Sequence, residues 1–275
     1  MCGLKPLVMA GGLLVGFSGA ALAADLLPPP PPLAPPPAPI EVSGWYLRGD
    51  IGFSNQDADK LDNALYANGL VQNLNKGFDS APFIGIGAGY KFNNWIRADL
   101  TTEYRGKSNF TGLDRYADST LWTGWGTDSY TATKSEWTTL ANVYLDLGTW
   151  NGITPFVGAG IGMSRNTISD FTDTNVVTAA LAYGREHSQW EFAWALYAGL
   201  AYQVTPNFSV ELAYRYLDLG DAQSGDLVGY NGANSTFNPM KFKDLTSQDI
   251  KIGLRWLIGP TTAAAEPYPP LVRSY

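Results

Sequence analysis

Residues 249–258 alternate strictly between an apolar and a polar set, and this alternation is the feature that most constrains the fold. The apolar set is Ile250, Ile252, Leu254, Trp256 and Ile258, and the other set is Asp249, Lys251, Gly253, Arg255 and Leu257. A period of two is that of a β-strand. An apolar face that ends in Trp, opposite a charged face, is typical of a strand between lipid and a polar lumen. Ten residues at ~3.4 Å each, tilted by ~45°, rise ~24 Å, which matches the apolar band of an outer-membrane barrel. We therefore predict that this stretch closes a transmembrane β-barrel.

Seven earlier segments share the alternation, so the chain is predicted to cross the membrane eight times. They span residues 44–53, 82–92, 94–105, 136–147, 153–164, 190–204 and 208–219. An even number of antiparallel strands returns both chain ends to one side of the membrane. Short connections at Asn93, 148–152 and 205–207 alternate with long ones at about 54–81, 106–135, 165–189 and 220–243. The expected fold is an all-β, eight-stranded antiparallel barrel, an up-and-down meander with short periplasmic turns and four long outer loops.

The first 23 residues have the features of a secretory signal peptide. Lys5 gives the positive start, residues 7–20 are apolar, and Ala21-Leu22-Ala23 is a cleavage site. An uncleaved membrane anchor is the alternative interpretation. The single cysteine, Cys2, lies in this segment, so the mature chain is expected to have no disulfide and no thiolate metal site.

Two proline-containing segments flank the predicted barrel, which we place at residues 44–259. In the lead-in, residues 24–43, nine of the twelve residues 28–39 are proline, which predicts an extended polyproline spacer. A ligand for a periplasmic partner is the alternative for this run. The C-terminal tail, residues 260–275, contains Pro267, Pro269 and Pro270 and is also expected to be extended.

Composition narrows the class of protein and of partner. After the signal segment no stretch approaches ~18 consecutive apolar residues, so no transmembrane helix is expected in the mature chain. The chain has 30 Gly, nine Trp and 15 Tyr, as expected for close strand packing and an aromatic girdle. The formal net charge is −7, and loss of Lys5 with the signal takes it to −8. Such an acidic chain is not expected to bind nucleic acid.

Several stretches resemble a known family. Gly-Trp-Tyr-Leu-Arg-Gly-Asp-Ile-Gly-Phe at 44–53, after the Pro-rich lead-in, resembles the opening strand of small alphaproteobacterial outer-membrane proteins. That group comprises OmpA-like barrels of the porin and surface-antigen type and includes heme-binding members. Gly-Ala-Gly-Tyr at 87–90 and Pro-Phe-Val-Gly-Ala-Gly-Ile-Gly at 155–162 are similar to its repeated strand patterns. The resemblance covers residues 44–259 and implies an eight-stranded barrel in the bacterial outer membrane, but no particular activity.

The last strand also resembles the barrel-assembly signal of such proteins. Lys251, Gly253, Trp256 and Ile258 stand at the expected offsets, which implies recognition by the barrel-assembly machinery. Many members end on the aromatic residue of this strand, whereas this chain continues through residues 260–275. Outer-membrane lipid and lipopolysaccharide are the expected neighbours of the outward face.

Inward-facing charges form the main candidate site, a polar cluster in the lumen. Its members are Arg48, Asp50, Lys91, Arg97, Asp99, Glu103, Asp146, Glu211, Arg215, Asp249, Lys251 and Arg255. Six charges of each sign predict ion pairing across a narrow barrel. Asp249 and Lys91, at strand ends, are the two that could instead lie in solvent. Six inward glycines, at 85, 87, 89, 158, 160 and 162, leave space and favour an open lumen instead.

No constellation predicts catalysis, a cofactor or a metal. His187, the single histidine, lies beside Ser188 in the third long loop, and neighbours on an extended chain point in opposite directions. A heme-binding role through His187 is one alternative function, and a small passive porin is another. Our main expectation is a structural, surface-exposed protein that is not an enzyme and whose long loops are the candidate surface for an unidentified ligand. The aromatic residues of 121–130 are either such a surface or strand extensions above the membrane.

Overall fold

The computed structural model describes residues 43–64, 66, 71–118, 121–122, 124–234 and 236–258. The predicted signal peptide, residues 24–42 of the lead-in and the C-terminal tail lie outside the described residues. Within the described ranges, no helix has the length and apolar character needed to cross a membrane.

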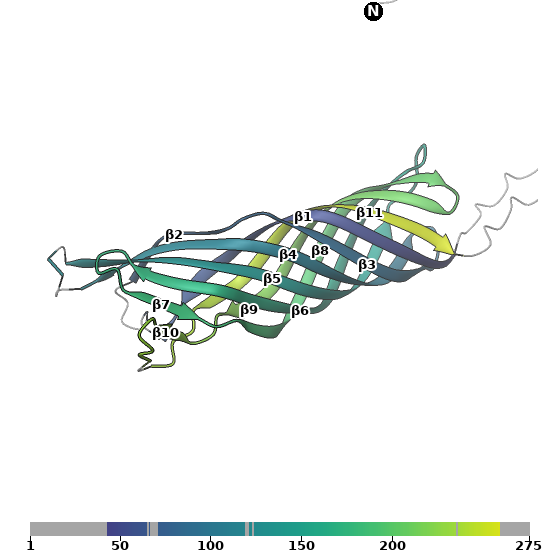
Figure 1. The fold of residues 1–275 in the computed structure, drawn as a ribbon. Coiled ribbons are helices and arrows are strands. Elements are labelled where there is room, and N and C mark those ends of the chain that lie inside the picture. Colours follow the sequence, from purple (N-terminus) through teal and green to yellow (C-terminus); the bar gives the residue numbers. More distant parts are fainter. Residues whose placement is uncertain are drawn as a thin grey trace, which may run out of the picture. The chain divides into compact units, whose positions relative to one another are not determined.

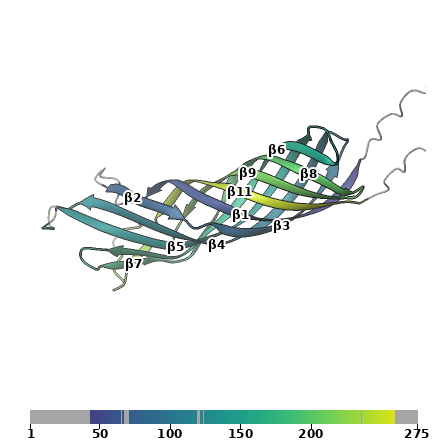
Figure 2. The same ribbon diagram turned by 90° about the horizontal axis from the view of Figure 1, so that it is seen from above.

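Eleven strands make up the described part of the chain. They are β1 (Gly44–Asp62), β2 (Val71–Phe78), β3 (Ala81–Lys91), β4 (Ile96–Ala117), β5 (Trp125–Asp146), β6 (Ile153–Asn175), β7 (Leu181–Gly184), β8 (His187–Thr205), β9 (Phe208–Gln223), β10 (Leu227–Gly229) and β11 (Lys241–Ile258). Eight of them form an antiparallel ring in the order β1, β3, β4, β5, β6, β8, β9, β11. Pairing of β1 with β11 closes the ring, and Trp45 lies opposite Ile258 (Figures 1 and 2). The predicted eight-stranded barrel is confirmed.

In the half of the barrel that holds both described chain ends, the alternation of side chains along each strand gives the wall an apolar outer face and a polar inner face. Trp45, Leu47 and Ile51 are exposed on the outer side of β1, whereas Tyr46 and Arg48 are buried inside. The other strands of the ring repeat this pattern, so that apolar side chains face outward and polar side chains face inward. This arrangement suits a wall between lipid and a polar interior.

The strands continue well past this membrane band, which corrects the prediction of four long loops. β5 has 22 residues where the sequence predicted only residues 136–147. At ~3.4 Å per residue and a tilt of ~45°, 22 residues rise ~50 Å, about twice the apolar band of an outer-membrane barrel. Most of the first three long connections is therefore strand, whereas the fourth, at about 220–243, is strand only at its two ends and in β10. β2, β7 and β10 widen the wall beside β4 and β6.

Beyond the band the polarity of the wall inverts. Between Trp137 and Trp125, the first residue of β5, the outward residues of this strand are Ser135, Thr133, Thr131, Ser129 and Thr127, while Tyr130 and Ala132 are buried inside. Water replaces lipid outside, so the projecting half has the pattern of a water-soluble barrel, with the apolar side chains within.

Four phenylalanines form the core of the projecting half. Ring centroids of Phe110 lie 4.9 Å from those of Phe78 and Phe242, and Phe171 lies 6.3 Å from Phe242. All four rings are at least nine-tenths buried. The barrel interior is therefore filled by aromatic side chains above the membrane band and by polar ones within it.

Candidate functional site

Arg48 joins its own strand, β1, to three others across the lumen. Its Nε and Nη2 each donate to Asp50 at 2.9 Å, and its Nη1 donates to Asp99 of β4 at 2.7 Å. The same guanidinium bonds the Tyr144 hydroxyl at 3.1 Å and Glu211 of β9 at 3.3 Å. Every donor of this arginine has a carboxylate or hydroxyl partner, as a buried charge requires.

Glu211 also lies close to two arginines, near the end of the lumen that holds both described chain ends. The Glu211 carboxylate lies 3.2 Å from Arg97 and 3.0 Å from Arg255, and Arg97 pairs with Asp146 at 3.1 Å. The Arg97 guanidinium also lies over the Tyr144 ring, 4.2 Å from its centroid, in a favourable cation–π contact. The side chains of Arg97, Arg255 and Tyr144 therefore fill the lumen at this end of the barrel.

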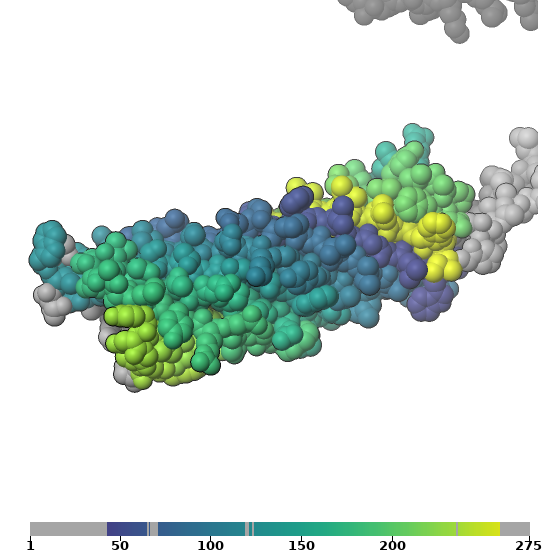
Figure 3. Space-filling model, in the orientation of Figure 1, coloured from purple at the N-terminus to yellow at the C-terminus, as the bar shows by residue number. Residues whose placement is uncertain are grey.

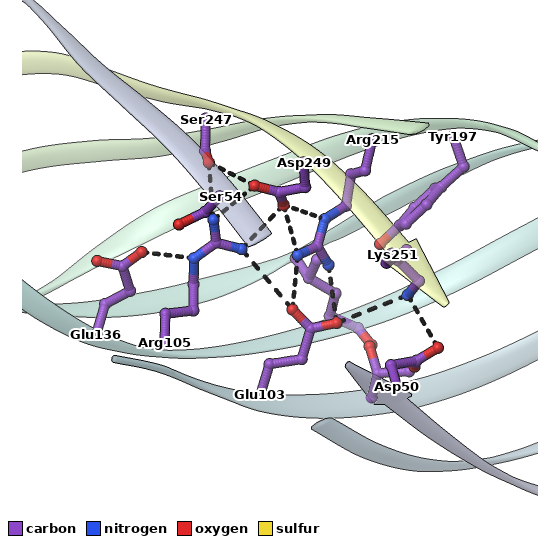
Figure 4. Close-up of polar contacts among 12 residues, drawn as sticks. Asp50, Ser54, Glu103, Arg105, Glu136, Tyr197, Arg215, Ser247, Asp249 and Lys251 are labelled. Atoms are coloured by element: carbon purple, nitrogen blue, oxygen red, sulfur yellow. Dashed lines mark hydrogen bonds and ion pairs between the residues drawn. The ribbon is translucent and has the colours of Figure 1, made fainter. Parts of the chain in front are cut away.

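Arg215 of β9 lies at the centre of the network (Figure 4). Its Nη1 and Nη2 donate to the two oxygens of Glu103 at 2.9 and 2.7 Å, and its Nε donates to Asp249 at 2.7 Å. Lys251 lies 3.4 Å from Asp50 and 3.7 Å from Glu103. The bidentate geometry fixes the position of both partners, because the guanidinium fork matches a carboxylate.

Arg105 of β4 forms the top layer of the network. It donates from Nε to Glu136 at 2.6 Å and from Nη1 and Nη2 to Asp249 at 2.9 and 2.7 Å. Glu136 is also paired with Lys134, which in turn donates to Gln56 at 2.8 Å. These residues come directly beneath the aromatic core of the projecting half.

Eleven of the twelve predicted lumen residues take part in these ion pairs. The exception is Lys91, which is half-buried on β3 and has no ion pair with a described residue. The interpretation that Asp249 lies in solvent is wrong, because its carboxylate is fully buried between two arginines. The predicted lumen cluster also left out Arg105, Lys134 and Glu136. They stand at every second position of β4 and β5, in step with the other inward side chains. Extending that alternation along both strands would have predicted them.

The complete network is electrically balanced. Its cations are Arg48, Arg97, Arg105, Lys134, Arg215, Lys251 and Arg255, and its carboxylates are Asp50, Asp99, Glu103, Glu136, Asp146, Glu211 and Asp249. Seven charges of each sign therefore face one another inside the barrel.

The inward glycines do not leave the lumen open, contrary to the alternative interpretation. A Cβ on Gly89 would lie 2.5 Å from the Tyr46 ring, and a Cβ on Gly160 would overlap the Asn142 side chain. Phe156 fills the space beside Gly199 in the same way. Glycine on one strand thus makes room for a large side chain on another, so the space is occupied.

The predicted assembly-signal residues divide between the two faces of β11. Trp256 and Ile258 are exposed on the outer side, whereas Lys251 is buried in the network. Gly253 faces inward, where a Cβ would lie 2.6 Å from the Asp50 carboxylate.

Acidic residues gather in the projecting half, above the aromatic core. Asp114 accepts hydrogen bonds from the hydroxyls of Tyr66 and Tyr130, the latter at 2.9 Å. Asp114 lies opposite Asp128 in the β4–β5 ladder. Burial, reinforced by neighbouring carboxylates, raises the pKa of Asp128 to about 6 and that of Asp173 to about 7. Burial also raises the pKa of Asp114. The charge on this end of the barrel therefore changes near neutral pH.

The histidine is part of the barrel wall rather than of a loop. His187 is the first residue of β8, opposite Ile168. Ser188 exchanges a hydrogen bond with Thr167 at 2.8 Å, while His187 Nε2 lies 3.5 Å from Gln223 Nε2. Among the described residues, no group of three or more His, Cys, Asp or Glu side chains is arranged to hold a metal ion.

Comparison with known proteins agrees with this architecture. Residues 14–256 match the family model described as outer membrane protein beta-barrel domain. The chain belongs to this outer-membrane β-barrel family. It is 32% identical to an uncharacterized protein of Brucella abortus over 281 aligned positions, covering 90% of this chain and 96% of that protein. It is 30% identical to a Rickettsia typhi protein named "Putative adhesin", covering 77% and 87% of the two chains.

Among solved structures, the outer membrane protein OprG of Pseudomonas aeruginosa matches 78% of this chain and 96% of its own, at 16% identity and a TM-score of 0.46. Family membership confirms the predicted outer-membrane location, so the outward apolar band contacts lipid.

Proposed function

We propose that this protein is a sealed outer-membrane barrel that presents a rigid binding surface outside the cell. The observation that carries the proposal is the projecting half, whose strands extend past the membrane band and enclose their own aromatic core. A barrel that served only to anchor flexible loops would need neither strands that extend past the membrane nor a separate aromatic core above it. The name of the Rickettsia typhi relative supports attachment to a host surface as the purpose of this end.

Exposed aromatic side chains at the strand tips are the proposed contact surface. Trp122 is 92% exposed in the β4–β5 connection, and Tyr230 and Phe237 are 75% and 72% exposed between β10 and β11. In Figure 3 the teal, green and yellow-green segments that include these connections gather at the end away from the described chain termini. Large exposed aromatic side chains are unfavourable in water and are enriched at interaction sites.

A shallow pocket of about 260 Å³ opens at the same end. It is lined by Asp59, Lys60, Leu61, Asp62, Tyr66, Val71, Asn73 and Lys76. Lys76 of β2 donates to the carbonyls of Ala58 and Asp59 of β1, so it ties the two strands beside the pocket. The proposed platform therefore offers a polar recess next to its aromatic tips.

The filled lumen supports this role over a passive porin. Paired charges fill the membrane band, and aromatic rings fill the half above it. Eight-stranded barrels are just wide enough for side chains to occupy the interior. We propose that the protein carries no solute and has no enzymatic activity. Ser188 bonds Thr167 rather than His187, which supports the second point.

The last strand and the outward face suggest which molecules the protein contacts during assembly and in the membrane. We propose that the barrel-assembly machinery recognises β11 through Trp256 and Ile258, and that lipopolysaccharide lies against the outer rim of the wall.

The attachment proposal is tested by displaying the protein on a non-adherent Gram-negative strain and counting bacteria bound to cultured mammalian cells. The triple variant Trp122→Ser/Tyr230→Ser/Phe237→Ser should lose most of the attachment. The control variant Ala180→Ser/Ala233→Ser changes exposed residues at the same end and should attach like the unmodified protein. Equal attachment by both variants at equal surface levels would refute the aromatic tips as the contact.

A further inference from the structure

The outer wall changes from apolar to polar at a defined position on each strand. On the wall formed by β4, β5, β6 and β8, the continuous apolar band of the outer face ends at Tyr104, Trp137, Met163 and Trp190. The first charged outward side chains beyond this boundary are Lys107 and Arg165. Both are cations, and both stand where headgroups of the outer leaflet meet the barrel.

Aromatic rings flank one of these cations. In the strand ladder Tyr104 lies opposite Trp137, Trp137 opposite Arg165, and Arg165 opposite Trp190. Arg165 therefore stands between two tryptophans on neighbouring strands. Lys107 lies two strands away, in the β4 bulge between Arg105 and Ser108. Two strand spacings put the two cations on the order of 10 Å apart.

Neither cation is used inside the protein. Both side chains are exposed, and neither has a hydrogen bond or an ion pair with a described residue. Arg115, farther out on β4, donates two hydrogen bonds to Gln72. Lys107 and Arg165 are therefore free to bind an anion from the membrane.

The opposite wall carries the opposite charge at the same boundary. Asp218 follows Tyr216 on β9, and Asp57 follows Phe53 on β1. Both carboxylates flank Thr246 of β11 in the ladder. The outward charges at this boundary on β4 and β6 are thus cationic, those on β1 and β9 are acidic, and Asp79 beside β4 accepts a hydrogen bond from Asn109 at 3.1 Å. An anionic headgroup is therefore attracted to the wall of Lys107 and Arg165 rather than to the opposite one.

Hydroxyl groups cover the cationic wall beyond the two cations. Ser135 lies opposite Thr167, which exchanges a hydrogen bond with Ser188 at 2.8 Å. Farther out, Thr131 and Thr172 exchange one at 2.6 Å. Hydroxyls both donate and accept, and sugars present the same groups. The first outward carboxylate of β6, Asp170, comes five residues after Arg165.

We propose that the wall of β4, β5, β6 and β8 is a binding site for a phosphorylated glycolipid of the outer leaflet. Lys107 and Arg165 bind phosphates of its sugar headgroup through charge-assisted hydrogen bonds. Trp137 and Trp190 lie against the boundary between acyl chains and headgroup, and the hydroxyl rows meet the sugars farther out. The inference rests on the proposed position of lipopolysaccharide against this rim.

Native mass spectrometry of the full protein in detergent micelles tests the site, with bisphosphorylated lipid A as the probe. Phosphatidylglycerol and dephosphorylated lipid A separate recognition of a phosphorylated sugar from recognition of any anionic lipid. The unmodified protein should bind bisphosphorylated lipid A at least tenfold more tightly than either. Lys107→Gln/Arg165→Gln should lose at least tenfold in affinity, and each single variant should lose part of it. The matched variant Asp57→Asn/Asp218→Asn should bind as tightly as the unmodified protein or more tightly.

Two results would overturn the site. One is equal affinity of the Lys107→Gln/Arg165→Gln and unmodified proteins, both migrating as folded barrels. The other is binding of phosphatidylglycerol as tight as that of lipid A. Attachment to mammalian cells is a separate readout, because the aromatic side chains lie in the connections at the strand tips, beyond the boundary where Lys107 and Arg165 stand. A protein that binds lipid A but not cells would refute only the attachment role.

Discussion

Replacement of Arg215 by methionine should destabilise the barrel strongly. Methionine keeps much of the side-chain volume but removes every donor. Glu103 would lose both short bonds of its bidentate pair, and Asp249 would lose its bond to Arg215 Nε. Glu103 would retain only Lys251 at 3.7 Å and Arg105 at 3.9 Å.

The size of the effect follows from burial. Both carboxylates are at most about 1% exposed, so neither can recover its solvation in water. Removing one partner of a buried ion pair costs ~3–5 kcal/mol because it leaves an uncompensated buried charge. The Lys243–Asp221 pair at the surface is the matched comparison, with side chains 39% and 30% exposed. Lys243→Met should cost only ~0–1 kcal/mol, since water screens such a pair.

Guanidinium unfolding of the barrel in lipid vesicles measures both changes. The free energy of unfolding should fall several-fold more for Arg215→Met than for Lys243→Met. Adding Glu103→Gln to Arg215→Met should restore part of the loss, because the unpaired charge is then removed as well. Similar small losses for Arg215→Met and Lys243→Met would refute the ion network as a stabilised, water-poor interior.

Three further predictions concern the membrane register, the orientation and the projecting half. Leu254→Arg should cost ~2–4 kcal/mol and reduce heat-modifiable folded protein, since Leu254 faces mid-membrane lipid; normal yield and migration would contradict this register. An epitope inserted at Gly124, in the β4–β5 connection, should be accessible on intact cells, and staining of permeabilised cells alone would show the opposite orientation. The raised pKa values of Asp128 and Asp173, about 6 and about 7, mean that the folded state binds protons that the unfolded chain releases above ~4. Stability of this end should therefore rise as pH falls from 8 to 5. Amide exchange of residues 126–130, corrected for intrinsic rates, should slow accordingly, and Asp173→Asn should flatten the dependence; unchanged pH dependence would contradict this cause.

The membrane-embedded half could be predicted well from the sequence. Lipid on one side and a narrow lumen on the other impose a period of two with apolar residues outward. That rule placed Ile250, Ile252 and Leu254 outward and Asp249 and Lys251 inward, as the structure has them. It also gave the eight strands of the ring and the position of both described chain ends at the same end of the barrel.

The projecting half was missed because the same rule stops applying above the membrane. There the outward residues are hydroxyls, such as Thr131 and Thr133, and the apolar residues face inward, such as Tyr130 and Phe110. The alternation continues with inverted polarity, so a search for a continuous outward apolar row stops at Trp137, although β5 extends to Trp125. Partner choice in the lumen could not be predicted either, because it depends on register between strands far apart in sequence. Arg215 and Glu103, for example, are 112 residues apart.

Single-channel recording of the unmodified protein in planar bilayers tests the central claim most directly. Ion pairs fill the lumen across the membrane, and a cluster of four buried phenylalanines lies above them, so no continuous water path is expected. The account predicts the absence of steady openings over a wide range of voltage, with protein shown to be inserted and folded. Large, stable, ohmic openings would contradict the sealed barrel and restore the porin interpretation.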